Sequence, residues 1–80
     1  MKSKVLYEIS VCFESSDIDP RREWFDVGLR KTPLSAKRKA IRESKKPKVY
    51  EAEIIGRDAY GECVYHSYWR NGKLEIDMCV

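Results

Sequence analysis

The chain has 80 residues, of which 42% are hydrophobic and 36% charged, and its formal net charge is +3. This length fits one domain with one modest core, and the apolar share is too high for a disordered chain. No segment approaches the ~20 consecutive apolar residues that cross a bilayer, and the N-terminus lacks the apolar region of a secretory signal. We therefore expect a cytoplasmic protein that has no contact with a membrane.

The first 30 residues predict two strands. Apolar and polar residues alternate over 4–14 and again over 23–30, which is typical of strands with one buried face. Residues 15–20 between them have turn chemistry, so we expect a hairpin. In the second strand the alternation places Phe25, Val27 and Leu29 on one face, and Trp24 and Arg30 on the other.

A helix is predicted to follow at Thr32-Pro33. Thr32 can accept a hydrogen bond from a free amide at the helix start, and a proline at the first helical position has no amide to leave unpaired. The helix should end at Lys45 or Lys46, before Pro47. Its apolar stripe is narrow, and its members are Leu34, Ala36, Ala40 and Ile41.

Three further strands are predicted at 48–57, 62–70 and 73–78. Asn71-Gly72 favours a two-residue type I′ turn, because both residue types tolerate positive φ. That turn predicts a register for the last two strands. The predicted facing pairs are Arg70 with Lys73, Trp69 with Leu74, Tyr68 with Glu75, Ser67 with Ile76, His66 with Asp77, and Tyr65 with Met78.

These elements predict an α+β fold for a single domain spanning residues 1–80, in the order β-β-α-β-β-β. The sheet is expected to be mostly antiparallel, with four to five strands in the order 2-1-3-4-5 and the helix on one face. One short helix covers only part of one sheet face, so the other face must meet solvent or a partner.

The charge is distributed unevenly. Between residues 29 and 48 the chain has nine basic residues and one acid, Glu43, whereas the remainder has seven basic and twelve acidic residues. Lysine and arginine crowded on one helix form a positive field of the kind that binds phosphate backbones or acidic protein surfaces. The predicted binding residues are Lys31, Lys37, Arg38, Lys39, Arg42, Lys45, Lys46 and Lys48.

A second candidate surface lies on the sheet face away from the helix. Aromatic side chains beside arginines can stack on nucleobases, and exposed aromatics equally mark protein interfaces. The residues expected on this face are Trp24, Arg30, His66, Tyr68 and Arg70. Acidic residues including Glu51 and Glu53 are also expected there, facing solvent, where they would repel phosphate.

No catalytic or metal-binding constellation is visible, so we expect no enzymatic activity and no cofactor or metal. Regular alternation places Cys63 and His66 on opposite faces of a strand, which excludes a Cys–His pair. The third and fourth ligands of a zinc site are also missing. Three cysteines without a Cys-x-x-Cys motif predict free thiols rather than a disulfide framework.

Two functions remain open from the sequence. The first is a small binding module that contacts nucleic-acid backbone through the basic helix. The second is a protein-interaction module, which could be homodimeric or could inhibit a larger protein. In size and build the chain resembles the small accessory proteins that phages and plasmids encode, some of which inhibit host enzymes, and this resemblance implies the second function.

Overall fold

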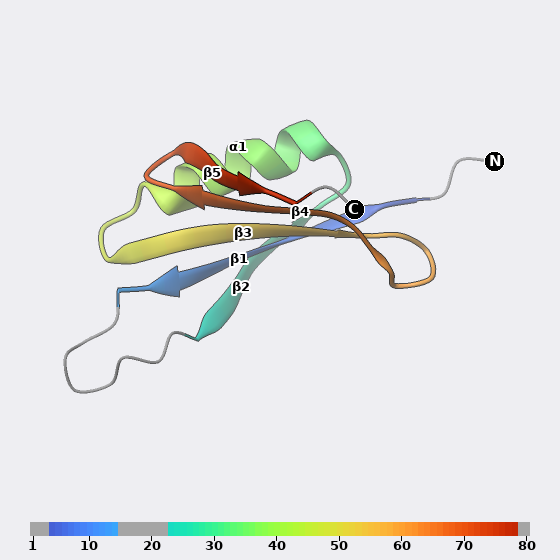
Figure 1. Cartoon of the computed structure of the whole chain (residues 1–80), viewed down its shortest axis with the longest axis horizontal. Helices are drawn as coiled ribbons and strands as arrows, with labels where there is room; N and C mark the ends of the chain where they lie inside the picture. The colour runs from blue at the N-terminus through green and yellow to red at the C-terminus, as the bar shows by residue number, and fades with distance from the viewer. Residues whose placement is uncertain (1–3, 15–22, 79–80) are drawn as a thin grey trace.

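The structure is a computed structural model that describes residues 4–14 and 23–78 (Figure 1). The expectations for the turn at 15–20 and for the thiol of Cys79 lie outside these residues. The elements are β1 (Leu6–Phe13), β2 (Trp24–Arg30), α1 (Pro33–Ser44), β3 (Val49–Arg57), β4 (Cys63–Arg70) and β5 (Lys73–Asp77). This order is the predicted one, so the α+β fold is confirmed.

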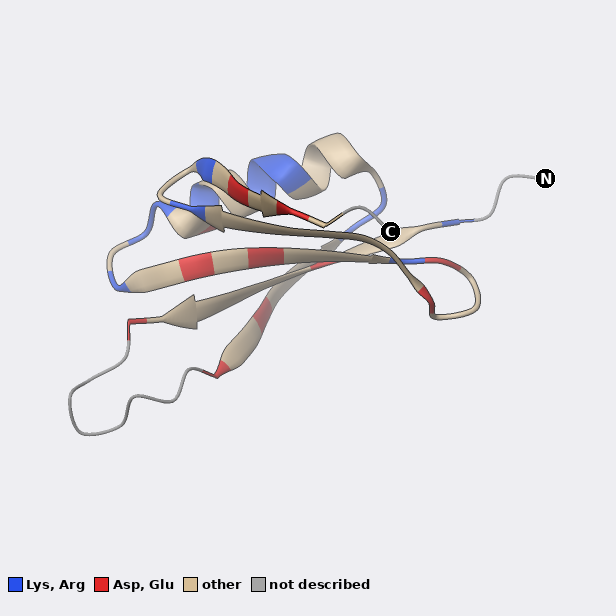
Figure 2. Cartoon of the chain, viewed as in Figure 1, with Lys and Arg blue, Asp and Glu red and all other residues tan. Residues whose placement is uncertain are grey.

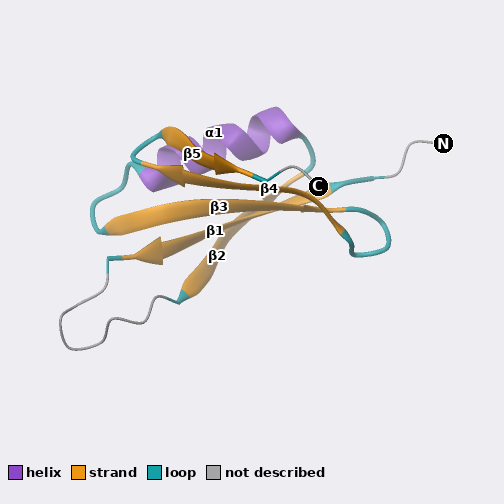
Figure 3. Ribbon diagram, viewed as in Figure 1, coloured by secondary structure: helices purple, strands orange, loops and turns teal. Residues whose placement is uncertain are grey.

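The five strands form one antiparallel sheet in the order β2-β1-β3-β4-β5, as predicted. The crossover through α1 brings β3 back beside β1, and α1 packs against β1, β2, β3 and β4 on one side of the sheet (Figure 3). We call the opposite side the open face. Directly opposite residues share a face, and this relation assigns Cys12, Glu53, His66 and Tyr68 to the open face.

The core lies between α1 and the sheet. Ile9, Val11, Ala52 and Ile54 are fully or almost fully buried there, and Trp69 is 7% exposed. Ala36 and Ala40 supply the helix side of this layer, so the helix backbone can approach the sheet closely. The buried layer is small, as expected for a chain of this length.

The helix begins as predicted. The Thr32 side chain accepts a hydrogen bond from the amide of Ser35 at 3.2 Å, and Pro33 occupies the first turn. The predicted apolar stripe is wrong at one position, because Leu34 is 60% exposed. The buried side of the helix is completed instead by two polar residues of its last turn, Glu43 and Ser44.

A bulge between β1 and β2 changes the predicted faces of the second strand. Ser10 lies opposite Asp26, whereas Ile9 lies opposite Gly28, so Val27 is an extra residue and the alternation shifts by one. Leu29 consequently lies opposite Glu8 on the open face, and Arg30 lies opposite Tyr7 on the helix side. The prediction that placed Arg30 beside Trp24 is therefore wrong.

The turn at Asn71-Gly72 is confirmed, with φ values of 51° and 80°. The first two facing pairs, Arg70 with Lys73 and Trp69 with Leu74, are also confirmed. Beyond them Glu75 is an extra residue, so Ile76 lies opposite Tyr68 and Asp77 opposite Ser67. A bulge of this kind exchanges the two faces of a strand, and the four other predicted pairs are therefore wrong.

Candidate nucleic-acid interface

The outer surface of α1 carries a line of cations. Arg38, Arg42 and Lys45 are spaced i, i+4 and i+7, so they project from one side of the helix, and all three are exposed. Lys37 lies exposed beside this line, with Lys31 before the helix and Lys48 after it. We call these six residues the basic surface, and Figure 2 shows how lysine and arginine concentrate on the helix and its flanks.

Glu43 neutralises two of the predicted binding residues. Its carboxylate Oε2 lies 2.6 Å from the ammonium of Lys46 and 3.5 Å from that of Lys39, and its side chain is only 6% exposed. Burial acts to raise the pKa of Glu43, but the hydrogen bonds and charges of Lys46 and Lys39 outweigh it, so the pKa lies below its ordinary value of 4.5. Lys39 and Lys46 therefore have a partner within the protein, and we leave them out of the basic surface.

The other cations of the segment have no ion-pair partner among the residues that the structure describes. Of the nine basic residues between positions 29 and 48, two have an ion pair within the described ranges 4–14 and 23–78, which leaves seven without one. The acids of the sheet do not reach across to the helix: Glu8 pairs with Arg57, and Glu75 pairs with Arg70. No acid of the described ranges therefore forms an ion pair with the basic surface.

Arg30 extends this region of positive charge along β2. A Cβ added at Gly28 would lie 3.3 Å from Arg30 Nη1 and 3.3 Å from Lys39 Cε, so both side chains cover that glycine on the helix side of the sheet. Arg30 Nη1 also donates to the carbonyl of Leu29 at 2.9 Å. The bulge in β2 thus adds a cation to the helix side that regular alternation assigned elsewhere.

On the open face the polar side chains are partnered. His66 Nε2 lies 2.6 Å from Glu53 Oε2, and Glu53 is 9% exposed although it was expected to face solvent. The predicted partner of His66, Asp77, is turned to the other face by the bulge in β5. Glu53 is diagonal to His66 on β3, where a carboxylate can reach the imidazole.

Tyr68 completes this cluster. Burial, and then the hydrogen bond and negative charge of Glu53, raise the pKa of Tyr68 above its ordinary value of 10.0. The ring of Tyr68 lies 4.8 Å from that of His66 and 6.0 Å from that of Trp24, measured between centroids. Two of the predicted sheet-face residues, His66 and Tyr68, thus meet at Glu53, and Trp24 lies against Tyr68. The sequence placed Glu53 on this face but did not predict that it is buried there.

Arg70 lies at the edge of the open face, near the start of β3. Its guanidinium carbon lies 4.2 Å from the centroid of the Tyr50 ring, and Nη2 donates to the Tyr50 hydroxyl at 2.6 Å. Nη2 of Arg70 also lies 3.7 Å from Glu51 Oε2, and its Nε lies 3.0 Å from Glu75 Oε2. The open face therefore holds its charges in contacts within the protein.

The described residues show no group of three or more histidine, cysteine or acidic side chains that could hold a metal ion. A bulge at Val64 breaks the alternation that was expected to separate Cys63 from His66, and Cys63 Sγ donates instead to the carbonyl of Tyr65 at 3.5 Å.

Among the described residues no helix has the length and apolar character required to cross a membrane.

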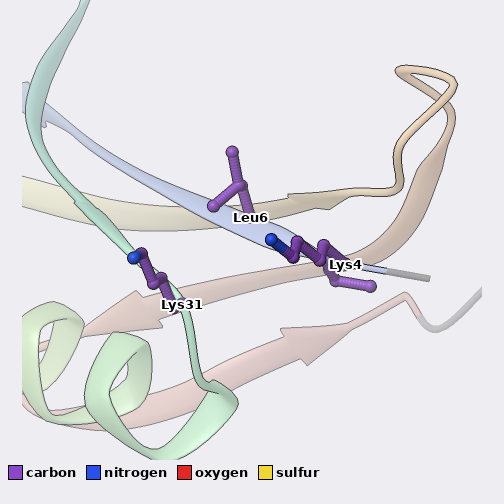
Figure 4. A pocket seen from close by; sticks show the side chains of 4 residues that line it. Lys4, Leu6 and Lys31 are labelled. Carbon is purple, nitrogen blue, oxygen red and sulfur yellow. The ribbon is translucent and has the colours of Figure 1, made fainter. Parts of the chain in front are cut away.

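Two shallow depressions border the basic surface at its two ends. One, of about 330 Å³, is lined by Lys4, Val5, Leu6 and Lys31, and Figure 4 shows Lys4 from the segment before β1 and Lys31 from the segment before α1. The other, of about 410 Å³, lies where the chain leaves α1 and meets the β4–β5 turn. Of the two, the second depression shares Lys45 and Lys48 with the basic surface, whereas the first shares only Lys31.

Comparison with known proteins gives no relative from which a function could be transferred. No model of a protein family matches the chain, and neither a curated protein nor a solved structure matches it significantly.

Proposed function

We propose that this protein binds the phosphodiester backbone of nucleic acids through the basic surface of α1. The observation that carries the proposal is the seven cations between positions 29 and 48 that have no ion pair among the described residues. Such cations displace counterions from a nucleic acid when they contact its phosphates. Contacts of this kind position a protein on the strand and carry little sequence preference.

The spacing of the exposed cations supports a continuous contact. The line Arg38, Arg42 and Lys45 spans two turns of the helix, which is about 10 Å at a rise of 1.5 Å per residue. Because a duplex carries one phosphate charge per about 1.7 Å of its axis, several phosphates lie within reach of that line. The contact is expected to be of micromolar affinity at best and to weaken steeply with salt.

The test is a fluorescence-anisotropy titration of labelled duplex DNA and single-stranded RNA, each at several salt concentrations. The double variant Arg38→Gln/Arg42→Gln should reduce the slope of log K against log salt by about two for the duplex, because two phosphate contacts are lost. The matched control is Lys4→Gln/Lys73→Gln, which removes the same charge from two exposed positions outside the basic surface. Undetectable binding of both nucleic acids at low salt, or equal slopes for the two variants, would contradict the proposal.

One observation favours a second candidate for the binding partner, a protein whose surface is acidic and contains an apolar pocket. Leu34 is 60% exposed among the cations, and a nucleic-acid backbone gives such a side chain nothing to contact. An apolar anchor within a charged rim is instead typical of protein interfaces. Leu34→Ser should leave nucleic-acid affinity unchanged if the backbone is the partner, whereas it should weaken a protein complex recovered after nuclease treatment.

A further inference from the structure

The depression at the C-terminal end of α1 gathers cations from two parts of the chain. The lining residues that bear charge or a phenol are Lys45, Lys46, Lys48, Arg70, Tyr50 and Glu14. The chain between α1 and β3 supplies three lysines, and the end of β4 supplies Arg70 from the far side. Four cations and a tyrosine hydroxyl therefore line one depression, together with a single acid, Glu14.

These cations differ in how strongly they are engaged. Lys46 is paired with Glu43, and Arg70 contacts Glu51 and Glu75. Lys45 and Lys48 have no ion pair with any described residue, so they carry the free charge of the depression. Arg70 still contributes, because a guanidinium has five donor positions and its contacts use only Nε and Nη2.

The walls of the depression are fixed to one another. Ser44 Oγ accepts a hydrogen bond from the amide of Gly72 at 2.8 Å and donates to the carbonyl of Ile41 at 2.9 Å, which ties the β4–β5 turn to the helix. Lys45 lies against Gly72, where an added Cβ would collide with its aliphatic chain. The lysines of the depression therefore extend from backbone segments that are hydrogen-bonded to one another.

Lys48 adds an independent signal. Its φ is 71°, in the left-handed region that a lysine adopts only at a cost, and the turn that follows α1 holds it there. Its carbonyl accepts a hydrogen bond from the amide of Glu14 at 2.8 Å. Residues kept in such conformations cluster at binding sites, and here the strained residue is one of the two free cations.

From this arrangement we infer that the depression is a subsite for a single phosphate group. A phosphate oxygen accepts several hydrogen bonds at once, and ammonium and guanidinium groups together supply them. The negative end of the helix dipole, Glu14 and the carboxylates paired with Lys46 and Arg70 oppose an anion. The subsite therefore depends on the ammonium groups of Lys45 and Lys48, which have no ion pair with any described residue, and on the guanidinium donors of Arg70 that these pairs leave unused. The inference rests on the proposed function in one respect: the natural source of the phosphate is then one backbone position of a bound strand.

The experiment follows backbone amide shifts of the full chain by NMR. One arm titrates inorganic phosphate against chloride at constant ionic strength, and the other titrates a short oligothymidylate. Both probes should shift the amides of 45–50 and 70–72 most, with the phosphate arm saturating in the millimolar range. Lys48→Asn should weaken phosphate binding at least threefold, since asparagine tolerates the left-handed backbone while removing the charge. Lys4→Gln, which removes the same charge at the opposite end of the sheet, should leave it unchanged.

Removing the opposing acid gives a gain of affinity that damage to the fold would not produce. Glu14→Gln should tighten phosphate binding at least twofold, whereas Glu62→Gln, an exposed acid in the β3–β4 loop, should not. Phosphate shifts spread evenly over the chain, or absent from 45–50, would overturn the subsite even if oligonucleotide binding persists. Localised phosphate shifts without oligonucleotide binding would support the subsite and overturn the proposed function.

Discussion

The basic surface of α1 and the open face of the sheet both carry many charged groups, but they differ in whether those groups are paired within the described part of the protein. On the open face Glu53 is 9% exposed and contacts His66 at 2.6 Å, while Arg57 reaches Glu8 at 3.2 Å. On the helix Glu43 pairs with two lysines, and the remaining cations meet no acid within the described part of the chain.

This difference separates charges that stabilise the fold from charges that do not. A buried carboxylate with several donors specifies how strands pack, because leaving any of those groups without a partner costs free energy. Neighbouring cations at i and i+4 repel one another and slightly destabilise their own helix. The open face therefore contributes to folding, and the basic surface is available for an external anion.

The largest expected effect comes from truncating one residue of each kind. Glu53→Ala should lower the free energy of unfolding by about 1–3 kcal/mol, because the hydroxyl of Tyr68 and the imidazole of His66 lose their buried partner. Arg42→Ala should change it by less than about 0.5 kcal/mol. Urea denaturation of both variants measures the difference, with Glu62→Ala as the control for losing an exposed acid. Similar costs for Glu53→Ala and Arg42→Ala would remove the distinction between the two surfaces.

The sequence was sufficient to predict the elements, their order in the sheet and the positive-φ turn at Asn71-Gly72. These features depend on local signals: period-two alternation, the Thr32-Pro33 helix start and residues that accept positive φ. The chain contains a clear signal for each. The exposed line of cations was also predictable, because helical spacing alone places Arg38, Arg42 and Lys45 together.

The errors arose where one extra residue enters a strand. Bulges at Val27 and Glu75 exchanged the faces of Arg30 and Asp77, and no local residue pattern announced either bulge. Glu43 was seen in the sequence as the one acid among many bases. Its burial between Lys39 and Lys46 depends on how α1 rests on the sheet, which is a tertiary property.

Glu43 allows the comparison to be tested within the helix itself. Its pKa is lowered in the folded state, so the stability it contributes is present above 4.5 and is lost as pH falls through the lower folded value. At neutral pH Glu43→Gln should cost about 1–2 kcal/mol, since charge-assisted bonds to two lysines are lost. The variant and the parent should converge in acid, as urea titrations at pH 7 and in the acid range would show. A cost that is the same at both pH values would mean that packing, rather than charge, makes Glu43 important.

The smallest effect is expected at the phenol of the open-face cluster. Tyr68→Phe leaves Glu53 its contact with His66, so the cost at neutral pH should stay below about 1 kcal/mol. Above pH 10 the parent also loses stability through Tyr68. Because the pKa of Tyr68 is raised in the folded state, its contribution to stability is intact below pH 10.0 and is lost as pH rises through the folded pKa. The variant should therefore lose less stability in alkali than the parent. Tyr60→Phe is the matched control, because Tyr60 is 89% exposed and lies in the β3–β4 loop, away from this cluster. If Tyr68→Phe and Tyr60→Phe reduce the loss of stability in alkali equally, Tyr68 ionises like a solvent-exposed phenol. The carboxylate of Glu53 beside it would then not stabilise the open face.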